Sequence, residues 1–248
     1  MKSSTSRRGL SASTLKLLAC ILMLVDHIGL KFFPSEDIFR IIGRLSFPIF
    51  AYFIAEGCRY TRNRAKRFLL VFILGVLCES AYILYTHRLQ GNILLTFSAS
   101  IAPIYCLQLL KRCIASRRPV QIVLASLLFT AALVAAYPLS ILLDLDYGFA
   151  GVILPIFASL LDYKDGEAPV CFKPLDLLPY RLCFFFIGLL LLVYTKGFSS
   201  LQVWCLPAIL LLALYNGAAG SKRMKYGFYL FYPLHLLLIE LIAILITR

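Results

Sequence analysis

Long apolar runs, separated by short polar and basic segments, dominate this chain. A helix that crosses a membrane needs about 20 predominantly apolar residues, and several of these runs reach that length. Strands of a membrane barrel would instead read as alternating segments of about 10 residues. The pattern therefore predicts an all-α, polytopic transmembrane helix bundle with about nine spans, in a range of about eight to ten. We expect the spans at residues 15–33, 38–57, 68–86, 92–110, 120–141, 148–161, 182–195, 201–215 and 228–247.

Composition narrows the class further. Of the 248 residues, 61% are hydrophobic and only 15% are charged. Soluble domains average about 45–50% apolar and about 25% charged residues, so a soluble fold of this length would expose much of the apolar excess. A soluble globular domain and a disordered chain are therefore excluded. The same apolar excess excludes a small disulfide scaffold. The eight cysteines show no C-x-x-C pair and no metal-ligand spacing, so no metal is predicted, and we interpret most of them as small reduced hydrophobic residues.

Basic residues cluster in the short segments between the apolar runs, and the formal net charge is +13. Such placement fixes the orientation of a membrane protein, because cytoplasmic loops carry an excess of Lys and Arg. A cytoplasmic N-terminus puts most of these residues on the inner side, which also argues against nucleic acid as a partner. We expect a cytoplasmic tail at residues 1–14 and a single transmembrane domain at 15–248, embedded in the lipid bilayer of the cytoplasmic membrane.

Ionisable residues inside the first two predicted spans are the strongest candidates for a site. A charged side chain at the bilayer centre costs about 2.5–3.5 kcal/mol, so each one needs a partner or a function. Asp26 and His27 lie in the outer half of the first span, and Arg44 lies at a comparable depth in the second. A short loop at Pro34–Asp37 would bring them together. Two interpretations are open: an Asp26–Arg44 ion pair that locks the hairpin, or a pair that orients His27 as a base.

Further polar side chains are candidates for lining a polar or substrate cavity. Glu56 ends the second span, where pairing with the basic loop that follows is an equally good explanation. Glu79 has no basic residue in its own span, so it must pair across helices or be protonated. His235 comes two residues after Pro233, whose missing N–H group can kink the helix and open a cavity. The cavity candidates are Glu56, Glu79, Asp144, Asp146, Tyr232 and His235, although the two aspartates also fit a solvated outer loop.

Several sequence blocks resemble the TraX family of membrane proteins, and they occur in the same order. They are LKLLACILMLVDHIG, IGRLSFPIFAYFIAEG with the basic loop RYTRNRAKR, GNILLTFS, LDLDYGFAGVILPIF, LALYNGAAG and KYGFYLFYPLHLLLI. The resemblance runs from about residue 15 to about residue 242. It implies an acyltransferase-like domain, because the family's named member acetylates the N-terminus of F-type pilin, with acetyl-CoA as the implied donor.

The chain is also similar to membrane acyltransferases that acetylate cell-surface sugars. Those proteins carry an Arg, ten intervening residues and a His on the first helix, and Lys16 and His27 have the same spacing here. Lys keeps the charge of Arg but lacks its bidentate fork. The resemblance implies that His27 is catalytic, with Asp26 and Arg44 in support.

These implications predict a membrane-embedded acetyl- or acyltransferase. It would move an acyl group from cytoplasmic acyl-CoA to an amine or hydroxyl acceptor, such as a pilin-like protein, a peptide or a surface glycan. Basic residues at the inner surface could hold the phosphates of acetyl-CoA, although the positive-inside rule alone would also place them there. The donor-binding candidates are Lys16, Arg59, Arg62 and Lys66. Two other functions are open: a proton-coupled small-molecule transporter and a non-catalytic membrane assembly factor.

Overall fold

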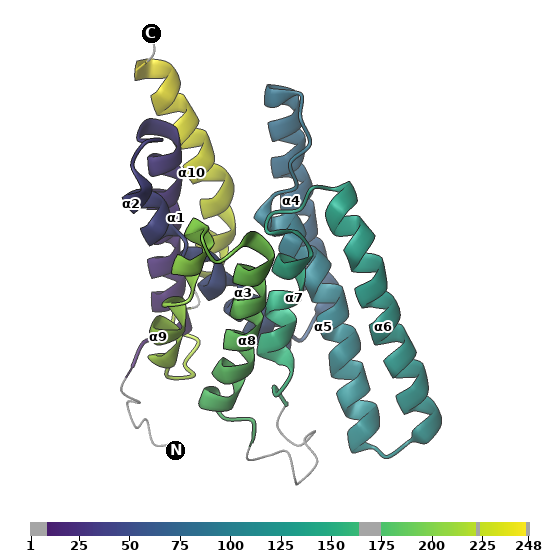
Figure 1. The fold of residues 1–248 in the computed structure, drawn as a ribbon. Coiled ribbons are helices and arrows are strands. Elements are labelled where there is room, and N and C mark those ends of the chain that lie inside the picture. The colour runs from purple at the N-terminus through teal and green to yellow at the C-terminus, as the bar shows by residue number, and fades with distance from the viewer. Residues whose placement is uncertain (1–8, 164–174, 222–223, 247–248) are drawn as a thin grey trace. The chain divides into compact units, whose positions relative to one another are not determined.

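The computed structural model describes residues 9–163, 175–221 and 224–246. Within these ranges the chain is helical, with one isolated bridge between Leu10 and Tyr215. The all-α prediction is confirmed (Figure 1). The helices are α1 (Ala12–Phe32), α2 (Asp37–Gly43), α3 (Ser46–Tyr60), α4 (Arg64–Thr86), α5 (Ile93–Ala115), α6 (Pro119–Leu142), α7 (Gly148–Ser159), α8 (Leu178–Lys196), the 3-10 helix η2 (Leu201–Cys205), α9 (Ala208–Ala213) and α10 (Met224–Ile246).

Polar caps fix where several of these helices begin. At the start of α1, the Ser11 side chain accepts a hydrogen bond from the backbone N–H of Thr14. Asn63 caps α4 and Asn92 caps α5 in the same way. A cap satisfies a backbone N–H that has no partner within its helix, so these short polar residues mark the starts of the apolar helices that follow.

Six helical segments in the described part of the chain are long and apolar enough to cross a membrane. They are Asp37–Tyr60, Arg64–Thr86, Ile93–Ala115, Pro119–Leu142, Leu178–Lys196 and Gly227–Ile246. The expected spans at 15–33, 148–161 and 201–215 are not among these six. The first of the three carries several charges, and the other two form shorter helices. The prediction of a helical membrane protein is therefore supported, whereas the count of about nine spans and the orientation of the N-terminus are not confirmed.

Contacts within the chain divide it into two compact units. The terminal unit comprises Met1–Phe50 and Ser199–Arg248, and the central unit comprises Ala51–Phe198. In the terminal unit, α1 packs against both α2 and α10 (Figure 1). The start of α1 is held to the end of α9, because the backbone N–H of Leu10 donates to the carbonyl of Leu214 at 2.7 Å.

Helices α1 and α10 run in the same direction. Their side chains meet in the same order along both helices: Lys16 with Phe228, then His27 with His235, then Lys31 with Glu240. Such an order occurs only when two neighbouring helices are parallel. The terminal unit therefore brings residues of the first helix and the last helix to matching depths.

In the central unit, α7 lies beside α5 and runs parallel to it. At the start of α7, the hydroxyl of Thr96 donates to the carbonyl of Asp146 at 3.1 Å. Beyond its end, the ammonium of Lys111 donates to the carbonyl of Asp162 at 2.7 Å. Although α7 has only 12 residues, it and the turn after it cover most of the length of α5. Gly188 allows α8 to approach α7 closely, since a Cβ atom there would lie 2.9 Å from the ring of Phe157.

The outer helices of the central unit expose apolar side chains. Leu84 on α4 is 79% exposed, and Leu124 and Leu127 on α6 are 61% and 62% exposed. In water, so large an exposed apolar surface would favour aggregation, whereas it suits contact with lipid tails. The exposure pattern thus agrees with the membrane class.

Candidate active site

Two histidines from distant parts of the sequence meet in the terminal unit. The imidazole rings of His27 on α1 and His235 on α10 pack edge to face, with centroids 5.0 Å apart and planes at 84°. The sequence predicted His27 as catalytic and His235 as a cavity residue. The structure shows that they are direct neighbours, which the sequence had not indicated.

Both imidazoles have the same backbone hydrogen bond. The Nδ1 atom of His27 lies 2.8 Å from the carbonyl oxygen of Met23, and Nδ1 of His235 lies 2.8 Å from that of Phe231. A carbonyl oxygen can only accept, so Nδ1 carries the hydrogen in both rings. In the neutral form of each ring, Nε2 then bears the lone pair and is the basic atom.

The surroundings of the two rings differ. His235 is buried at 4% exposure, and its Nε2 has no hydrogen-bond partner among the described residues. The ring of Phe231 stacks on it with centroids 4.7 Å apart, and the buried Tyr232 approaches it edge-on at 5.7 Å. His27 is only partly buried. The cavity candidate Tyr232 therefore lies next to the histidine pair.

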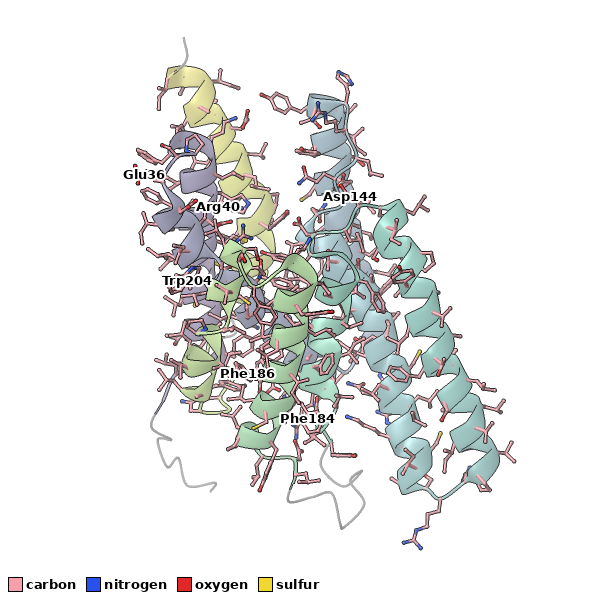
Figure 2. All side chains as sticks on the ribbon, in the orientation of Figure 1. Glu36, Arg40, Asp144, Phe184, Phe186 and Trp204 are labelled. Carbon is pink, nitrogen blue, oxygen red and sulfur yellow. The ribbon has the colours of Figure 1, made fainter. Side chains whose placement is uncertain are left out.

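Asp26 has a charged partner on α2. Its carboxylate forms an ion pair with the guanidinium of Arg40 at 3.0 Å, and Figure 2 labels Arg40 on this helix. The sequence named Arg44 as the partner, whereas Arg40, one helical turn earlier, makes this ion pair. Gly43 permits the close approach of α2, because a Cβ atom there would clash with the Asp26 side chain. Arg44 follows α2 directly and is half-buried.

A second ion pair joins α1 to α10 one helical turn beyond the histidines. The ammonium of Lys31 donates to both carboxylate oxygens of Glu240, at 3.0 and 2.8 Å. Toward the other end of α1, the ammonium of Lys16 lies 5.7 Å from the ring centroid of Phe228. Because each residue adds about 1.5 Å to a helix, Lys16 stands about 16 Å from His27 along α1.

Two predicted residues of the central unit, Glu56 and Arg59, belong to a network of buried charges. Glu56 accepts a hydrogen bond from Arg181 at 2.5 Å, and both side chains are buried. The guanidinium of Arg181 also lies over the ring of Tyr52, 5.4 Å from its centroid. The explanation that Glu56 pairs with the basic loop after it does not match this bond, since Arg181 lies on α8.

Arg59, predicted to bind the acyl donor, is part of the same network. It forms ion pairs with Asp162 at 3.0 Å and with Asp176 at 2.8 Å, and it also donates to the carbonyl of Tyr163. Two carboxylates therefore already occupy this guanidinium. The other two loop candidates, Arg62 and Lys66, are exposed.

Asp162 is the buried carboxylate at the centre of this network. Its exposure is 5%, and burial raises the pKa of Asp162 to about 6, although Arg181, Arg59 and Lys111 all favour its charged form. Lys111 is buried as well, and its ammonium donates to the carbonyls of Ser159 and Asp162. The ammonium thereby satisfies backbone groups at the end of α7.

Glu79 has a structural explanation that the sequence did not supply. Its carboxylate accepts hydrogen bonds from the backbone N–H of Gln90 at 2.9 Å and of Asn92 at 3.2 Å, and from the Asn92 amide at 3.1 Å. From the sequence, we expected Glu79 to pair across helices or to be protonated. Backbone and amide donors from the loop before α5 are sufficient to hold a buried carboxylate.

The two candidate aspartates, Asp144 and Asp146, lie in the α6–α7 loop, and Asp146 is partly buried. Asp144 is exposed, with a positive φ of 45°, and Figure 2 labels it in this loop. The backbone N–H of Asp146 donates to the carbonyl of Gly91 at 2.8 Å, which fixes the loop against the start of α5. Their suggested part in an acceptor entrance stays a prediction.

Sequence reasoning missed four residues that hold these groups in place. None of the four was named as a candidate from the sequence. The signal that could have found them is their position within one turn of the end of a predicted span. They are Arg40, Lys111, Asp162 and Arg181. Among the described residues, no cluster of three or more His, Cys, Asp or Glu side chains could hold a metal ion.

These features define a helical membrane protein with ionisable groups placed on its apolar helices. Comparison with known families then identifies it more closely: the chain belongs to the TraX family, whose model, described as TraX protein, matches residues 11–243. The resemblance found in the sequence is thus confirmed over most of the chain.

Two relatives show how far the similarity extends. The chain is 29% identical to a probable fimbrial assembly protein FimC, serogroup H1, of Dichelobacter nodosus, and the match covers 92% of this chain and 94% of that protein. It is 36% identical to an uncharacterised protein of Rickettsia prowazekii (strain Madrid E) over 37% of this chain and 35% of that protein. No solved structure matches the chain.

Proposed function

We propose that this protein is a membrane-embedded acyltransferase that uses cytoplasmic acyl-CoA, with acetyl-CoA as the donor. The observation that carries the proposal is the state of His27. The backbone carbonyl of Met23 occupies its Nδ1–H group, which leaves Nε2 as the basic nitrogen of the ring. A neutral imidazole of this kind serves as a general base or as a transient acyl carrier.

Charged neighbours support His27 in this role. Asp26 precedes it on α1 and is held by Arg40, so the pair fixes the first hairpin around the imidazole. Arg44 lies on the same face as Arg40, one turn further on, and we assign it to stabilising the negative oxygen of the reacting carbonyl. Lys16 stands about 16 Å away along α1, a distance that the extended pantetheine arm of CoA covers, and we assign it to the donor phosphates.

The acceptor is proposed to be a pilin-like protein with a free N-terminal amine. The Dichelobacter nodosus relative, which aligns with nearly all of this chain, is named as a probable fimbrial assembly protein. A free N-terminal amine in its neutral form is a nucleophile that can attack an acyl group. An acceptor hydroxyl on a peptide or a surface glycan would use the same chemistry.

The proposed location is the cytoplasmic membrane, with the N-terminus in the cytoplasm. Acyl-CoA is a cytoplasmic metabolite, so the N-terminal end of α1, which carries Lys16, has to face the cytoplasm. The clusters of Lys and Arg between the helices favour the same orientation.

The experiment is acyl transfer by the purified protein in liposomes. Radiolabelled acetyl-CoA is supplied with a pilin-like peptide that has a free N-terminus, and the control peptide has the same sequence with a blocked N-terminus. The proposal expects label on the free peptide alone. Absence of label on any acceptor amine or hydroxyl, with substrate uptake driven by a proton gradient, would instead establish a transporter. Absence of both activities would favour an assembly factor.

A further inference from the structure

The second histidine of the terminal unit has no role in a mechanism that uses a single base. His235 matches His27 in its backbone hydrogen bond, so both rings present Nε2 as the basic atom, and their centroids are 5.0 Å apart. One imidazole suffices for a direct transfer from thioester to acceptor. Two adjacent basic imidazoles suit a transfer in two steps.

Packing alone does not account for a histidine at this position. The ring of His235 stacks on Phe231 and contacts Tyr232 edge-on, and the residue is only 4% exposed. An aromatic hydrocarbon would fill such a space without leaving a polar atom unsatisfied. Instead, Nε2 is buried and has no hydrogen-bond partner among the described residues. An unsatisfied buried nitrogen is costly, which points to a function for it.

The carboxylates near the histidine pair are already ion-paired. The carboxylate of Asp26 is paired with Arg40, and the carboxylate of Glu240 is paired with Lys31. Each negative charge next to the two rings therefore already has a positive partner. Neither carboxylate is therefore needed as the partner of a histidine, and both rings keep Nε2 for the reaction.

We propose that His235 is a catalytic base that takes the proton of the acceptor, while His27 carries the acyl group. This inference rests on the proposed acyltransferase function and deepens it. In the first step, Nε2 of His27 bonds to the carbonyl carbon of the thioester. The carbon–sulfur bond breaks, and its electron pair leaves with the CoA thiolate.

In the second step, the acceptor nitrogen or oxygen bonds to the acyl carbon, and its proton passes to Nε2 of His235. The bond between the acyl carbon and His27 breaks, and its electron pair returns to the His27 ring. The proton on His235 then passes to the CoA thiolate or to water. The products are acylated acceptor and CoA thiol, and both histidines return to their neutral forms.

The test compares His235→Gln with the wild-type protein in liposomes. In the absence of acceptor, radiolabelled acetyl-CoA is expected to label both proteins equally, because His27 is intact. When the acceptor peptide is added, transfer by His235→Gln is expected to fall by about 100-fold or more, the usual share of a general base. Leu234→Ala, at an exposed neighbouring position of α10, is the control and keeps the wild-type rate.

Chemical rescue separates a base from a structural residue. His235→Ala leaves a space for free imidazole, which is expected to restore transfer in a dose-dependent manner, whereas it has no effect on Leu234→Ala. Wild-type transfer by His235→Gln, or parallel loss of labelling and transfer without rescue, would overturn the role of His235. A wild-type protein that transfers no acyl group at all would instead overturn the proposed function.

Discussion

Asp26 and Arg40 form an ion pair with a nitrogen–oxygen distance of 3.0 Å, and it connects the first helix to the short helix that follows. Both side chains are largely buried, with exposed fractions of 16% and 22%. Asp26 immediately precedes His27 in the sequence. The ion pair therefore couples the stability of the hairpin to the position of the imidazole.

Replacing Arg40 tests this coupling. Arg40→Met leaves the carboxylate of Asp26 without its partner, and we expect the free energy of unfolding in detergent to fall by roughly 1–3 kcal/mol. Acyl transfer should fall with it. Arg88→Met, at an exposed loop position, is the control and should change neither quantity. An Arg40→Met protein with wild-type stability and transfer would show that the pair has no such role.

Glu56 and Arg181 form a deeply buried ion pair in the central unit, and their side chains have exposed fractions of 7% and 6%. Arg181→Met strands a buried carboxylate, so we expect a loss of about 3–5 kcal/mol in the free energy of unfolding. The double variant Glu56→Leu, Arg181→Met removes both charges and should recover most of that loss. Chemical denaturation of the wild-type protein and of the two variants measures these free energies of unfolding. A double variant less stable than Arg181→Met would contradict this explanation.

Asp162 gives the central unit a pH dependence. Its pKa is raised from 3.8 to about 6 by burial, so between these values the folded protein holds a proton that the unfolded chain has released. The stabilising contribution is complete below pH 3.8 and is lost as the pH rises through about 6. Relative to Asp162→Asn, the wild-type protein should therefore lose stability from pH 4 to pH 7. A stability difference that stays constant over this range would contradict the raised pKa.

The parallel arrangement of α1 and α10 predicts the membrane topology. If two parallel helices both cross the membrane, the number of spans between them along the chain must be odd. Five of the six long apolar helices lie between α1 and α10. The two shorter apolar helices must then both cross, or neither does. Because α7 runs beside most of α5, we expect both to cross, which gives nine spans.

Cysteine labelling from outside decides between these topologies. In a background without native cysteines, Ser35→Cys after α1 and Ser199→Cys after α8 should react with an impermeant reagent on the same side. Ser221→Cys, before α10, should be on the opposite side. If Ser199→Cys and Ser221→Cys lie on the same side, opposite to Ser35→Cys, the short helices do not cross.

The sequence predicts the helical membrane class well, because the cost of exposing backbone and charge to lipid leaves a strong pattern. It also predicts that Asp26 pairs with an arginine of the next helix. We chose Arg44 from the sequence, whereas Arg40, one turn earlier on the same face, makes the ion pair. Which of the two pairs with Asp26 depends on how α2 packs against α1 at Gly43.

Patterns along the sequence do not predict which residues pair when they are far apart in the chain. Glu240 is separated from Lys31 by 209 positions, and Arg181 is separated from Glu56 by 125. His27 and His235 are equally remote, at the two ends of the chain. Depth along a predicted helix is readable from sequence, but the rotation and neighbours of each helix are set by tertiary packing.

The most direct measurement is acyl transfer by His27→Ala. The variant is reconstituted in liposomes and supplied with labelled acetyl-CoA and the free-amine peptide, with His87→Asn, at an exposed loop position, as the control. The account predicts that His27→Ala inserts and unfolds like the wild-type protein but transfers no acyl group, while His87→Asn transfers at the wild-type rate. Full transfer by a correctly inserted His27→Ala protein would contradict it.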